Sequence, residues 1–500
     1  MDAPRGKRQL IVLVRAATPP RAAAPGPQKR TSRSLAAQQP MLQNILTNYG
    51  ASLAPMFPAG RGRTAAGAVR RAAAPSAAAA PSVYNRVLAE EAKLDEIAKA
   101  LRDVPTVDAA YIKPAPEPAI NRMTPSGGPP AAATPDFSPR QDYLAAAPGG
   151  IDAHYAWKQS GGRGKGVTII DVEGEWQLSH EDLKVNNNGL LGGTVPGQDG
   201  WRNHGTAVAG TCIAANNGLG ITGICADARL GMISIFGSED RTSSMAIREA
   251  ADKLNPGDIL LVELHYPGPK HSYEERDDQD GYIAVEWWPD EYDAIEYAVG
   301  RGVTVVEAAG NGAQDLDDAL YDTPDPGFQP NWQNPFRRGK RDSGAILVGA
   351  GAPPQGTHSR TLYGPDRSRL DFSNFGNAVD AQGWGREVTT LGYGDLQGGS
   401  EDRWYTDEFA GTSSASPIIV GALACLQGIR RAQGAKPLTP AQARDLLRNT
   451  GSPQQAGPNA PVTERIGNRP DLKALVAALA KIVTPVAAAA PRTKRRVKQT

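Results

Sequence analysis

The sequence has little cysteine, no long apolar run and almost no net charge. Three cysteines in 500 residues exclude a disulfide-stapled scaffold; Cys212 and Cys225 could form one bridge, but we favour buried free thiols. No run of about 18 apolar residues is present, so we predict no membrane span. The apolar run at 10–14 is too short for the core of a signal peptide, which favours a cytoplasmic protein or export by a non-standard route.

The formal net charge of +1 is unevenly distributed along the chain. Residues 1–150 carry 19 Lys and Arg against 10 Asp and Glu, whereas the remainder carries 35 against 43. A basic front part and an acidic body could attract each other. The basic tail, 483–500, is short and lacks aromatic residues, so we expect a solvated, disordered end and no nucleic-acid partner.

The front of the chain alternates strand-like and helix-like patterns. We expect residues 1–118 to form a small α+β ferredoxin-like domain of order βαββαβ. Its strands are expected at 8–15, 51–57, 82–90 and 107–114, its helices at 40–50 and 91–105, and disordered Ala/Pro/Arg-rich inserts at 16–38 and 59–81. Residues 119–150 are rich in Pro, Ala and Gly and are interpreted as a linker and processing region.

Residues 151–482 alternate apolar strands with helices, the pattern of a parallel α/β sheet. The expected strands are 166–171, 229–236, 258–264, 303–309 and 345–350. In open parallel sheets, functional groups gather at the carboxyl ends of the strands. Asp171 ends one of these strands, Asn311 follows another, and His204 precedes an apolar helix, so we expect all three near one edge of the sheet.

The segment 411–417, GTSSASP, stands directly before a long apolar helix. Its hydroxyl groups could simply cap that helix. Alternatively, Ser413 is a nucleophile, because free N–H groups at a helix N-terminus can stabilise an oxyanion. Ser414 and Ser416 remain as alternative nucleophiles.

Together these polar groups would suffice for acyl transfer. His204 would take the proton from Ser413, and Asp171 would hold the imidazole tautomer. The Asn311 side chain and the Ser413 N–H would bind the oxyanion. Gly310 would let the substrate approach the backbone closely.

These segments resemble the subtilisin-like (S8) serine peptidases. The motifs that carry the resemblance are HEDL at 180–183, HGT at 204–206, AAGN at 308–311 and GTSSASP at 411–417. The resemblance covers about residues 150–482 and implies an α/β three-layer sandwich with a mostly parallel sheet. It also implies a serine endopeptidase acting on protein or peptide substrates, with Ser413 as the nucleophile.

The residues of the cleft depart from the family pattern. The strand that commonly reads Ser-Leu-Gly is Glu263-Leu264-His265 here, and we expect it to bind substrate. The residues after Asp171 are Val-Glu instead of Ser-Gly. Glu307 lies within another strand of the sheet. Glu263 and Glu307 could form a buried carboxyl pair with a raised pKa, or could face substrate cations.

Asp322 lies at the end of the acidic loop 315–322. One branch of the family carries an acidic residue of the S1 pocket at this position. The resemblance therefore implies a substrate-binding role for Asp322 and a preference for Arg or Lys at P1. The alternative is a solvated charged loop.

The resemblance also implies structural Ca²⁺, with no cofactor needed for the chemistry. It places a carboxylate ligand at Asp182 and a calcium loop at 215–221. The other ligands would be the Asn217 side chain and the carbonyls of Ala215, Leu219 and Ile221. The alternative is a loop held by its own hydrogen bonds.

Members of the family often carry an N-terminal prodomain that assists folding and then inhibits. The resemblance implies this role for residues 1–118, with the cleavage point within 115–150. A permanently attached accessory domain is the alternative. For the whole chain, the alternatives are a silent peptide-binding pseudo-protease, and a ligase or maturation protease dedicated to one partner.

Overall fold

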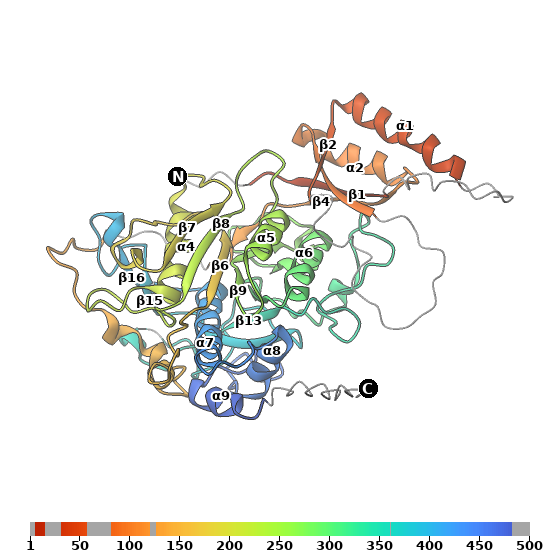
Figure 1. The fold of residues 1–500 in the computed structure, drawn as a ribbon. Coiled ribbons are helices and arrows are strands. Elements are labelled where there is room, and N and C mark those ends of the chain that lie inside the picture. The colour runs from red at the N-terminus through yellow and green to blue at the C-terminus, as the bar shows by residue number, and fades with distance from the viewer. Residues whose placement is uncertain (1–5, 16–31, 58–81, 121–126, 361, 483–500) are drawn as a thin grey trace, which may run out of the picture.

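The computed structural model describes residues 6–15, 32–57, 82–120, 127–360 and 362–482 (Figure 1). A seven-stranded sheet of order β14-β13-β12-β9-β6-β8-β7 forms the centre, and its paired strands run parallel. Its strands are β6 (Thr168–Glu173), β7 (Asn187–Gly192), β8 (Arg229–Ser234), β9 (Ile259–Val262), β12 (Thr304–Ala308), β13 (Ile346–Gly351) and β14 (Val379–Trp384). The predicted α/β class with a mostly parallel sheet is confirmed.

Helices cover both faces of this sheet. One face packs against α3 (Ala153–Ala156), α4 (Asp199–Ile213), α7 (Thr412–Ala432), α8 (Pro440–Asn449) and α9 (Leu472–Leu479). The other face packs against α5 (Ser243–Lys253) and α6 (Pro289–Gly300). Strand β9 reads Ile-Leu-Leu-Val and is buried at every position, as expected for a parallel strand covered on both faces.

Helix α7 is the one described helix that is long and apolar enough to cross a membrane. It lies wholly inside the protein, where the apolar face of a central helix packs on the sheet. Its length and composition are therefore explained by its place in the core.

Two smaller sheets lie beside the central one. One is three-stranded, with the order β11 (Tyr282–Ala284), β10 (Leu264–Pro267) and β5 (Glu117–Pro118). The other is the hairpin of β15 (Val388–Leu391) and β16 (Tyr405–Phe409). The 3₁₀ turns are η1 (Glu91–Lys93), η2 (Ser138–Arg140), η3 (Asp142–Leu144), η4 (Glu181–Leu183), η5 (Pro269–His271), η6 (Val285–Trp287), η7 (Ala319–Asp322), η8 (Thr357–Ser359) and η9 (Glu401–Arg403).

The N-terminal domain has the predicted order βαββαβ. Its elements are β1 (Gln9–Arg15), α1 (Ser32–Tyr49), β2 (Ser52–Pro55), β3 (Ser82–Leu88), α2 (Leu94–Arg102) and β4 (Val107–Lys113). They form an antiparallel sheet of order β2-β3-β1-β4 with both helices packed on one face. Helix α1 begins at Ser32 and includes Pro40, so the predicted insert at 16–38 is too long at its end. The rest of that insert and the insert at 59–81 lie outside the described residues.

The N-terminal domain docks on the α5–α6 face through a buried ion cluster. Lys113 Nζ lies 2.5 Å from Asp290 Oδ2 and 2.6 Å from Glu291 Oε1, and none of the three side chains is exposed. Tyr111 donates a hydrogen bond to Asp290 at 2.8 Å. Burial raises the pKa of Glu291, which Lys113 opposes, and the two carboxylates raise the pKa of Lys113 against its own burial. Figure 1 shows this domain lying beside α5 and α6.

Replacing Lys113 by Ala should leave Asp290 and Glu291 buried without their cation. We expect the free energy of unfolding to fall by about 3–5 kcal/mol, measured by urea unfolding of a Ser413→Ala chain that stays intact. Lys93→Ala is the matched control, because the Lys93 side chain is 39% exposed and its partner Glu90 is 74% exposed. Equal effects of the two substitutions would contradict a structural role for the buried cluster.

Candidate active site

Ser413 lies in the first turn of α7, which begins directly after Gly411. Gly411 has a φ of +108°, a conformation that favours glycine, and it turns the chain from β16 into the helix. The Ser413 N–H has no partner within the helix and donates to Ala119 O at 3.2 Å. The Ser413 hydroxyl is buried, and the Glu263 carboxyl lies within its reach.

The two neighbouring serines are held by structural hydrogen bonds. Ser414 Oγ donates to Trp384 O at 2.9 Å. Ser416 Oγ donates to Thr412 O at 3.0 Å and to a carboxylate oxygen of Glu263. Their hydroxyls are therefore engaged in packing α7 on the sheet, which sets Ser413 apart from them.

His204 lies within α4 rather than ahead of it. Its Nδ1 lies 2.8 Å from Glu173 Oε2, and both side chains are fully buried. Its Nε2 has no hydrogen-bond partner in the described part of the chain. The ring packs edge-on against Phe409, with centroids 5.8 Å apart. A carboxyl on Nδ1 and an unpartnered Nε2 are the arrangement of a general base.

The structure corrects the prediction that Asp171 holds the imidazole. Asp171 Oδ2 accepts a hydrogen bond from Trp176 Nε1 at 2.8 Å instead. Strand β6 continues past the predicted end at 171 to Glu173, and alternate residues of a strand share one face. Glu173 therefore lies on the same face as Asp171, two residues nearer the carboxyl end of the strand. A Cβ on Gly205 would lie 2.3 Å from Glu173 Oε1, so a glycine at this position leaves room for the Glu173 side chain.

Three buried carboxyl groups surround this site: Asp171, Glu173 and Glu263. Burial is the largest cause of a raised pKa for each. Glu173 raises the pKa of Asp171 further, and Asp171 raises that of Glu263. Because like charges repel in a buried pocket, the three groups are not all ionised together. Burial lowers the pKa of His204 to about 4, so the imidazole is neutral at pH 7.

Asn311 follows β12 and contacts Thr412, the first residue of α7. Its Oδ1 accepts hydrogen bonds from Thr412 N and Thr412 Oγ1, both at 2.9 Å. Its Nδ2 donates to Gln279 Oε1 at 3.2 Å. The Thr412 donors thus fix which end of the amide can donate. Gly310 has a φ of +97°, and a Cβ there would lie 2.7 Å from Asn374 Nδ2, so only glycine fits before Asn311.

The predicted substrate strand serves two purposes. Leu264 and His265 belong to β10 and pair antiparallel with β5. His265 Nδ1 also accepts the Asn311 N–H at 3.3 Å, and burial lowers the pKa of His265 to about 3. Glu263 instead accepts the Ser416 hydroxyl inside the protein. The backbone of Leu264 and His265 is therefore the part that binds an extended chain.

Glu263 and Glu307 do not form the predicted pair. Glu307 is in register with Val262, so Glu307 and Glu263 lie on opposite faces of the sheet. Burial raises the pKa of Glu307 well above its usual value, Glu286 raises it further, and Arg338 opposes the rise. Glu307 is fully buried and does not face a substrate cation.

The Asp322 carboxylate is bound by two nearby residues of the chain, Arg337 and Asn334. Its Oδ2 lies 3.0 Å from Arg337 Nη2, and its Oδ1 accepts from Asn334 Nδ2 at 2.9 Å. The hydrogen bonds from Arg337 lower the pKa of Asp322, and the side chain is 44% exposed. This is the geometry of the alternative, a solvated charged loop.

The predicted calcium residues are bound to one another. Asp182 Oδ1 accepts from Asn217 Nδ2 at 2.8 Å, and Asp182 Oδ2 accepts from Ile221 N at 3.0 Å and Tyr405 OH at 3.1 Å. Donor groups therefore point at the carboxylate from the positions where further oxygen ligands would be required.

Other groups of the loop 215–221 also form hydrogen bonds within the loop. Asn217 N donates to Ala215 O at 3.0 Å, and Leu219 N donates to Asn217 Oδ1 at 3.1 Å. The oxygens of Asn217 and Ala215 are thus used inside the loop. The oxygens of Asp182, Asn217 and Ala215 are therefore engaged in hydrogen bonds and do not fit a Ca²⁺ ligand set; this is the alternative of a loop held by its own hydrogen bonds.

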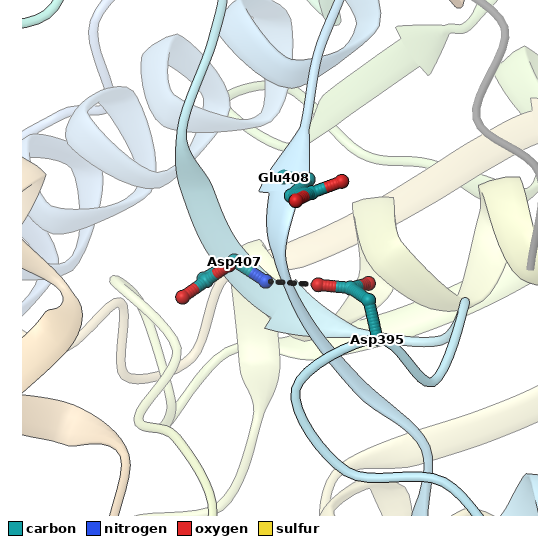
Figure 2. A group of neighbouring side chains, drawn as sticks. All are labelled: Asp395, Asp407 and Glu408. Carbon is teal, nitrogen blue, oxygen red and sulfur yellow. Dashed lines mark hydrogen bonds between the residues drawn. The ribbon is translucent and has the colours of Figure 1, made fainter. Parts of the chain in front are cut away.

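A separate acidic group lies at the β15–β16 hairpin. Oxygens of Asp395, Asp407 and Glu408 lie within 4.8 Å of one another (Figure 2). The Asp407 carboxylate is ion-paired with Arg140 and Arg360. Arg360 also lies 3.1 Å from Glu408. These guanidinium groups supply the positive charge that a cation would otherwise supply.

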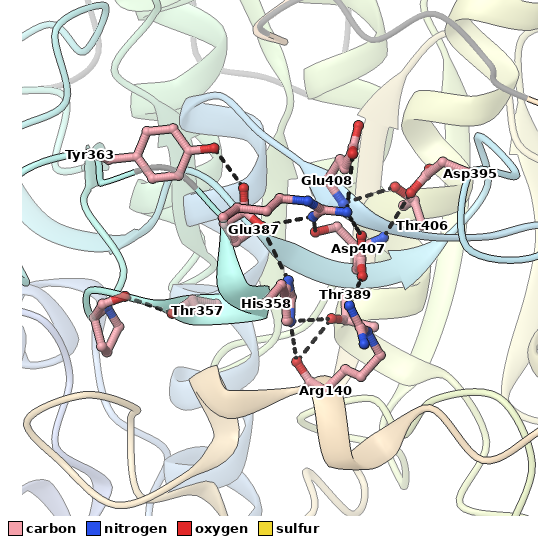
Figure 3. A network of polar contacts seen from close by, with 12 residues as sticks. Arg140, Thr357, His358, Tyr363, Glu387, Thr389, Asp395, Thr406, Asp407 and Glu408 are labelled. Atoms are coloured by element: carbon pink, nitrogen blue, oxygen red, sulfur yellow. Dashed lines mark hydrogen bonds and ion pairs between the residues drawn. The ribbon is translucent and has the colours of Figure 1, made fainter.

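The arginines belong to a wider network that anchors the hairpin (Figure 3). Arg360 Nη1 lies 2.8 Å from Glu387 Oε2, and His358 Nδ1 lies 3.2 Å from the same carboxylate. His358 Nε2 lies 2.9 Å from Arg140 O. Because β16 leads directly into the start of α7, this network holds the chain segment that carries Ser413.

Comparison with known proteins identifies the family of this chain. A profile described as the subtilase family matches residues 149–468. An intracellular serine protease of Paenibacillus polymyxa is 26% identical over 321 residues, covering 61% of this chain and 81% of that protein. Subtilisin BL of Lederbergia lenta is 25% identical over 298 residues, covering 58% of this chain and 84% of that protein.

Solved structures share the fold over nearly the whole chain. The epidermin leader peptide processing serine protease of Staphylococcus aureus has a TM-score of 0.52 at 16% identity, covering 96% of this chain and 100% of that one. Fervidolysin of Fervidobacterium pennivorans has a TM-score of 0.51 at 18% identity, covering 95% of this chain and 62% of that one.

Replacing Glu307 by Gln should make stability less dependent on pH. The folded-state pKa of Glu307 is raised, so wild-type stability is greatest below the unfolded pKa of about 4.3 and falls as pH rises toward the folded pKa. We therefore expect Glu307→Gln to be more stable than its parent at pH 8 by roughly 1–3 kcal/mol and equal to it near pH 4.

Urea unfolding at several pH values in a Ser413→Ala chain measures this difference. Glu90→Gln is the control, because the Glu90 side chain is 74% exposed. A stability difference for Glu307→Gln that stays constant between pH 4 and pH 8 would contradict the assignment.

Proposed function

The chain belongs to the subtilase family and is a serine endopeptidase, and from this premise we propose that Ser413, His204 and Glu173 form its catalytic triad. The contact of His204 Nδ1 with Glu173 Oε2 at 2.8 Å carries the proposal. The buried hydroxyl of Ser413 at the start of α7 supports it.

In this mechanism His204 Nε2 takes the proton of Ser413 as the hydroxyl attacks a peptide carbonyl. Glu173 accepts the Nδ1–H, which keeps Nε2 unprotonated and then stabilises the imidazolium. The Ser413 N–H and Asn311 Nδ2 donate to the oxyanion. The free N–H groups and the dipole of α7 favour negative charge at the same place.

Asp171 supports the triad without touching the imidazole. It is buried, it accepts the Trp176 indole N–H, and its raised pKa favours the protonated form. Burial also raises the pKa of Glu173, and the proposal places the negative charge on Glu173 because its Oε2 contacts His204 Nδ1. We therefore assign Asp171 a positioning role for the end of β6.

Residues 1–118 act in this proposal as an inhibitory prodomain. Strand β5, at the end of this part, pairs with β10 in the substrate cleft. The buried Lys113 cluster holds the domain on α6. A domain that blocks the cleft with its own chain fits an inhibitor better than the alternative of a permanent accessory domain. Subtilases commonly bind structural calcium, but here the predicted ligands are closed on themselves.

A dedicated maturation protease is the second candidate, favoured by the contacts of segment 268–284 with β5. Tyr282 and Gln279 of this segment donate hydrogen bonds to Glu117 and Pro118. Digestion of casein after removal of the N-terminal part separates the two candidates: a general endopeptidase degrades it, whereas a dedicated one leaves it intact.

The two carboxyl groups of β6 can be told apart by isosteric substitution. We expect Glu173→Gln to lower kcat by about 10³–10⁴-fold, because the amide disturbs the imidazole tautomer. We expect Asp171→Asn to lower it by less than about tenfold. The rates of self-cleavage and of peptide hydrolysis measure both, with Ser413→Ala as the inactive reference. Loss of activity in Asp171→Asn with retention in Glu173→Gln would reverse the assignment.

A further inference from the structure

Residues 117–120 of the chain itself lie against β10 and the start of α7. Strand β5 runs antiparallel to β10, with Glu117 opposite His265 and Pro118 opposite Leu264. The next carbonyl, that of Ala119, accepts the Ser413 N–H at 3.2 Å. A carbonyl oxygen on this N–H is placed where the proposed mechanism needs the reacting group.

We propose that Ser413 cleaves the bond between Ala119 and Ile120, and that the enzyme selects substrates with a small P1 residue and an acidic P3 residue. This inference rests on the proposed function and adds the bond and the specificity. It replaces the preference for basic P1 residues expected from Asp322, since Asp322 is paired with Arg337.

The P3 side chain has specific donors. Tyr282 OH donates to Glu117 Oε1 at 2.8 Å, and Gln279 Nε2 lies 3.5 Å from Glu117 Oε2. The Gln279 amide also donates to Pro118 O at 3.2 Å. Gln279 Oε1 also accepts from Asn311 Nδ2. The Gln279 side chain therefore links Pro118 of the bound segment to Asn311, the proposed oxyanion donor.

The space beside P1 is taken by backbone of the protein. Strand β11 pairs with the far edge of β10, and Gly281 N donates to Gly312 O at 3.0 Å. A Cβ on Gly312 would lie 2.1 Å from Tyr282 O. Strand β11 therefore fills the gap between β10 and the turn at 310–312. Ala119 is fully buried there, so a large P1 side chain would require β11 to move.

The chemical step is an ordinary hydrolysis. Ser413 Oγ bonds to the Ala119 carbonyl carbon, the bond to the Ile120 nitrogen breaks, and His204 passes the serine proton to that nitrogen. Water then attacks the ester, giving the Ala119 carboxylate and restoring Ser413. The products are a 1–119 fragment and a chain that begins at Ile120.

Intact mass and N-terminal sequencing test the bond directly. Purified wild type should acquire an N-terminus at Ile120, and Ser413→Ala should remain uncut. Ala119→Phe should slow this cleavage by at least about tenfold, whereas Ala119→Ser should cut at nearly the wild-type rate. Cleavage elsewhere, for example after Arg122, would overturn the inference and leave the proposed function standing.

Peptides test the specificity in trans. Quenched peptides with Glu-Pro-Ala before the scissile bond should exceed Glu-Pro-Phe and Glu-Pro-Arg in kcat/KM by at least about tenfold. Exchange of the P3 Glu for Gln should lower kcat/KM. In Tyr282→Phe the ratio of kcat/KM between the Glu and Gln peptides should be smaller than in the wild type, mainly because KM for the Glu peptide rises. A preference for Arg or Phe at P1 would refute the inference.

Labelling of Ser413 by a fluorophosphonate distinguishes failure of the proposed function from failure of the cleavage-site assignment. If the wild type is not cut, and Ser413 is not labelled even after removal of the N-terminal part, the proposed function itself fails. If Ser413 is labelled but the chain is uncut, the self-cleavage assignment fails, and the peptide ratios decide the specificity.

Discussion

The site depends on one buried contact, between His204 Nδ1 and Glu173 Oε2. A carboxyl and an imidazole that are both buried from water are stabilised by the hydrogen bond between them. The contact brings the end of β6 against α4, and Gly205 leaves the room that the longer glutamate side chain requires. It also leaves Nε2 as the basic nitrogen, so the chemistry proposed for Ser413 follows from it.

The second determinant is the strand layer around the cleft. Strand β10 has β5 on one side and β11 on the other, so one of its edges pairs with the peptide segment and the other is covered by β11. Gln279 links the two functions, since its amide contacts both Pro118 and Asn311. The proposed specificity thus comes from segment 268–284, which packs beside β5, while the groups proposed to react lie on β6, α4 and the start of α7.

Much of the fold and part of the site could be predicted from the sequence. Apolar strands alternating with helices indicate a parallel sheet, and the Gly-Thr-Ser run before an apolar helix places Ser413. Glu173 was missed because β6 extends two residues past the predicted strand end at 171, and a Glu at a strand end looks like a surface residue. The position of β11 could not be predicted, because its pairing with β10 joins segments whose approach is set by the tertiary fold.

The most direct test is the protonation state of His204. Selective ¹⁵N labelling is practical because the chain has six histidines, and His204→Ala assigns the signal in a Ser413→Ala background. We predict a neutral ring at pH 7 with the proton on Nδ1, retained in Asp171→Asn and disturbed in Glu173→Gln. A proton on Nε2, or a signal that responds only to Asp171→Asn, would contradict the account.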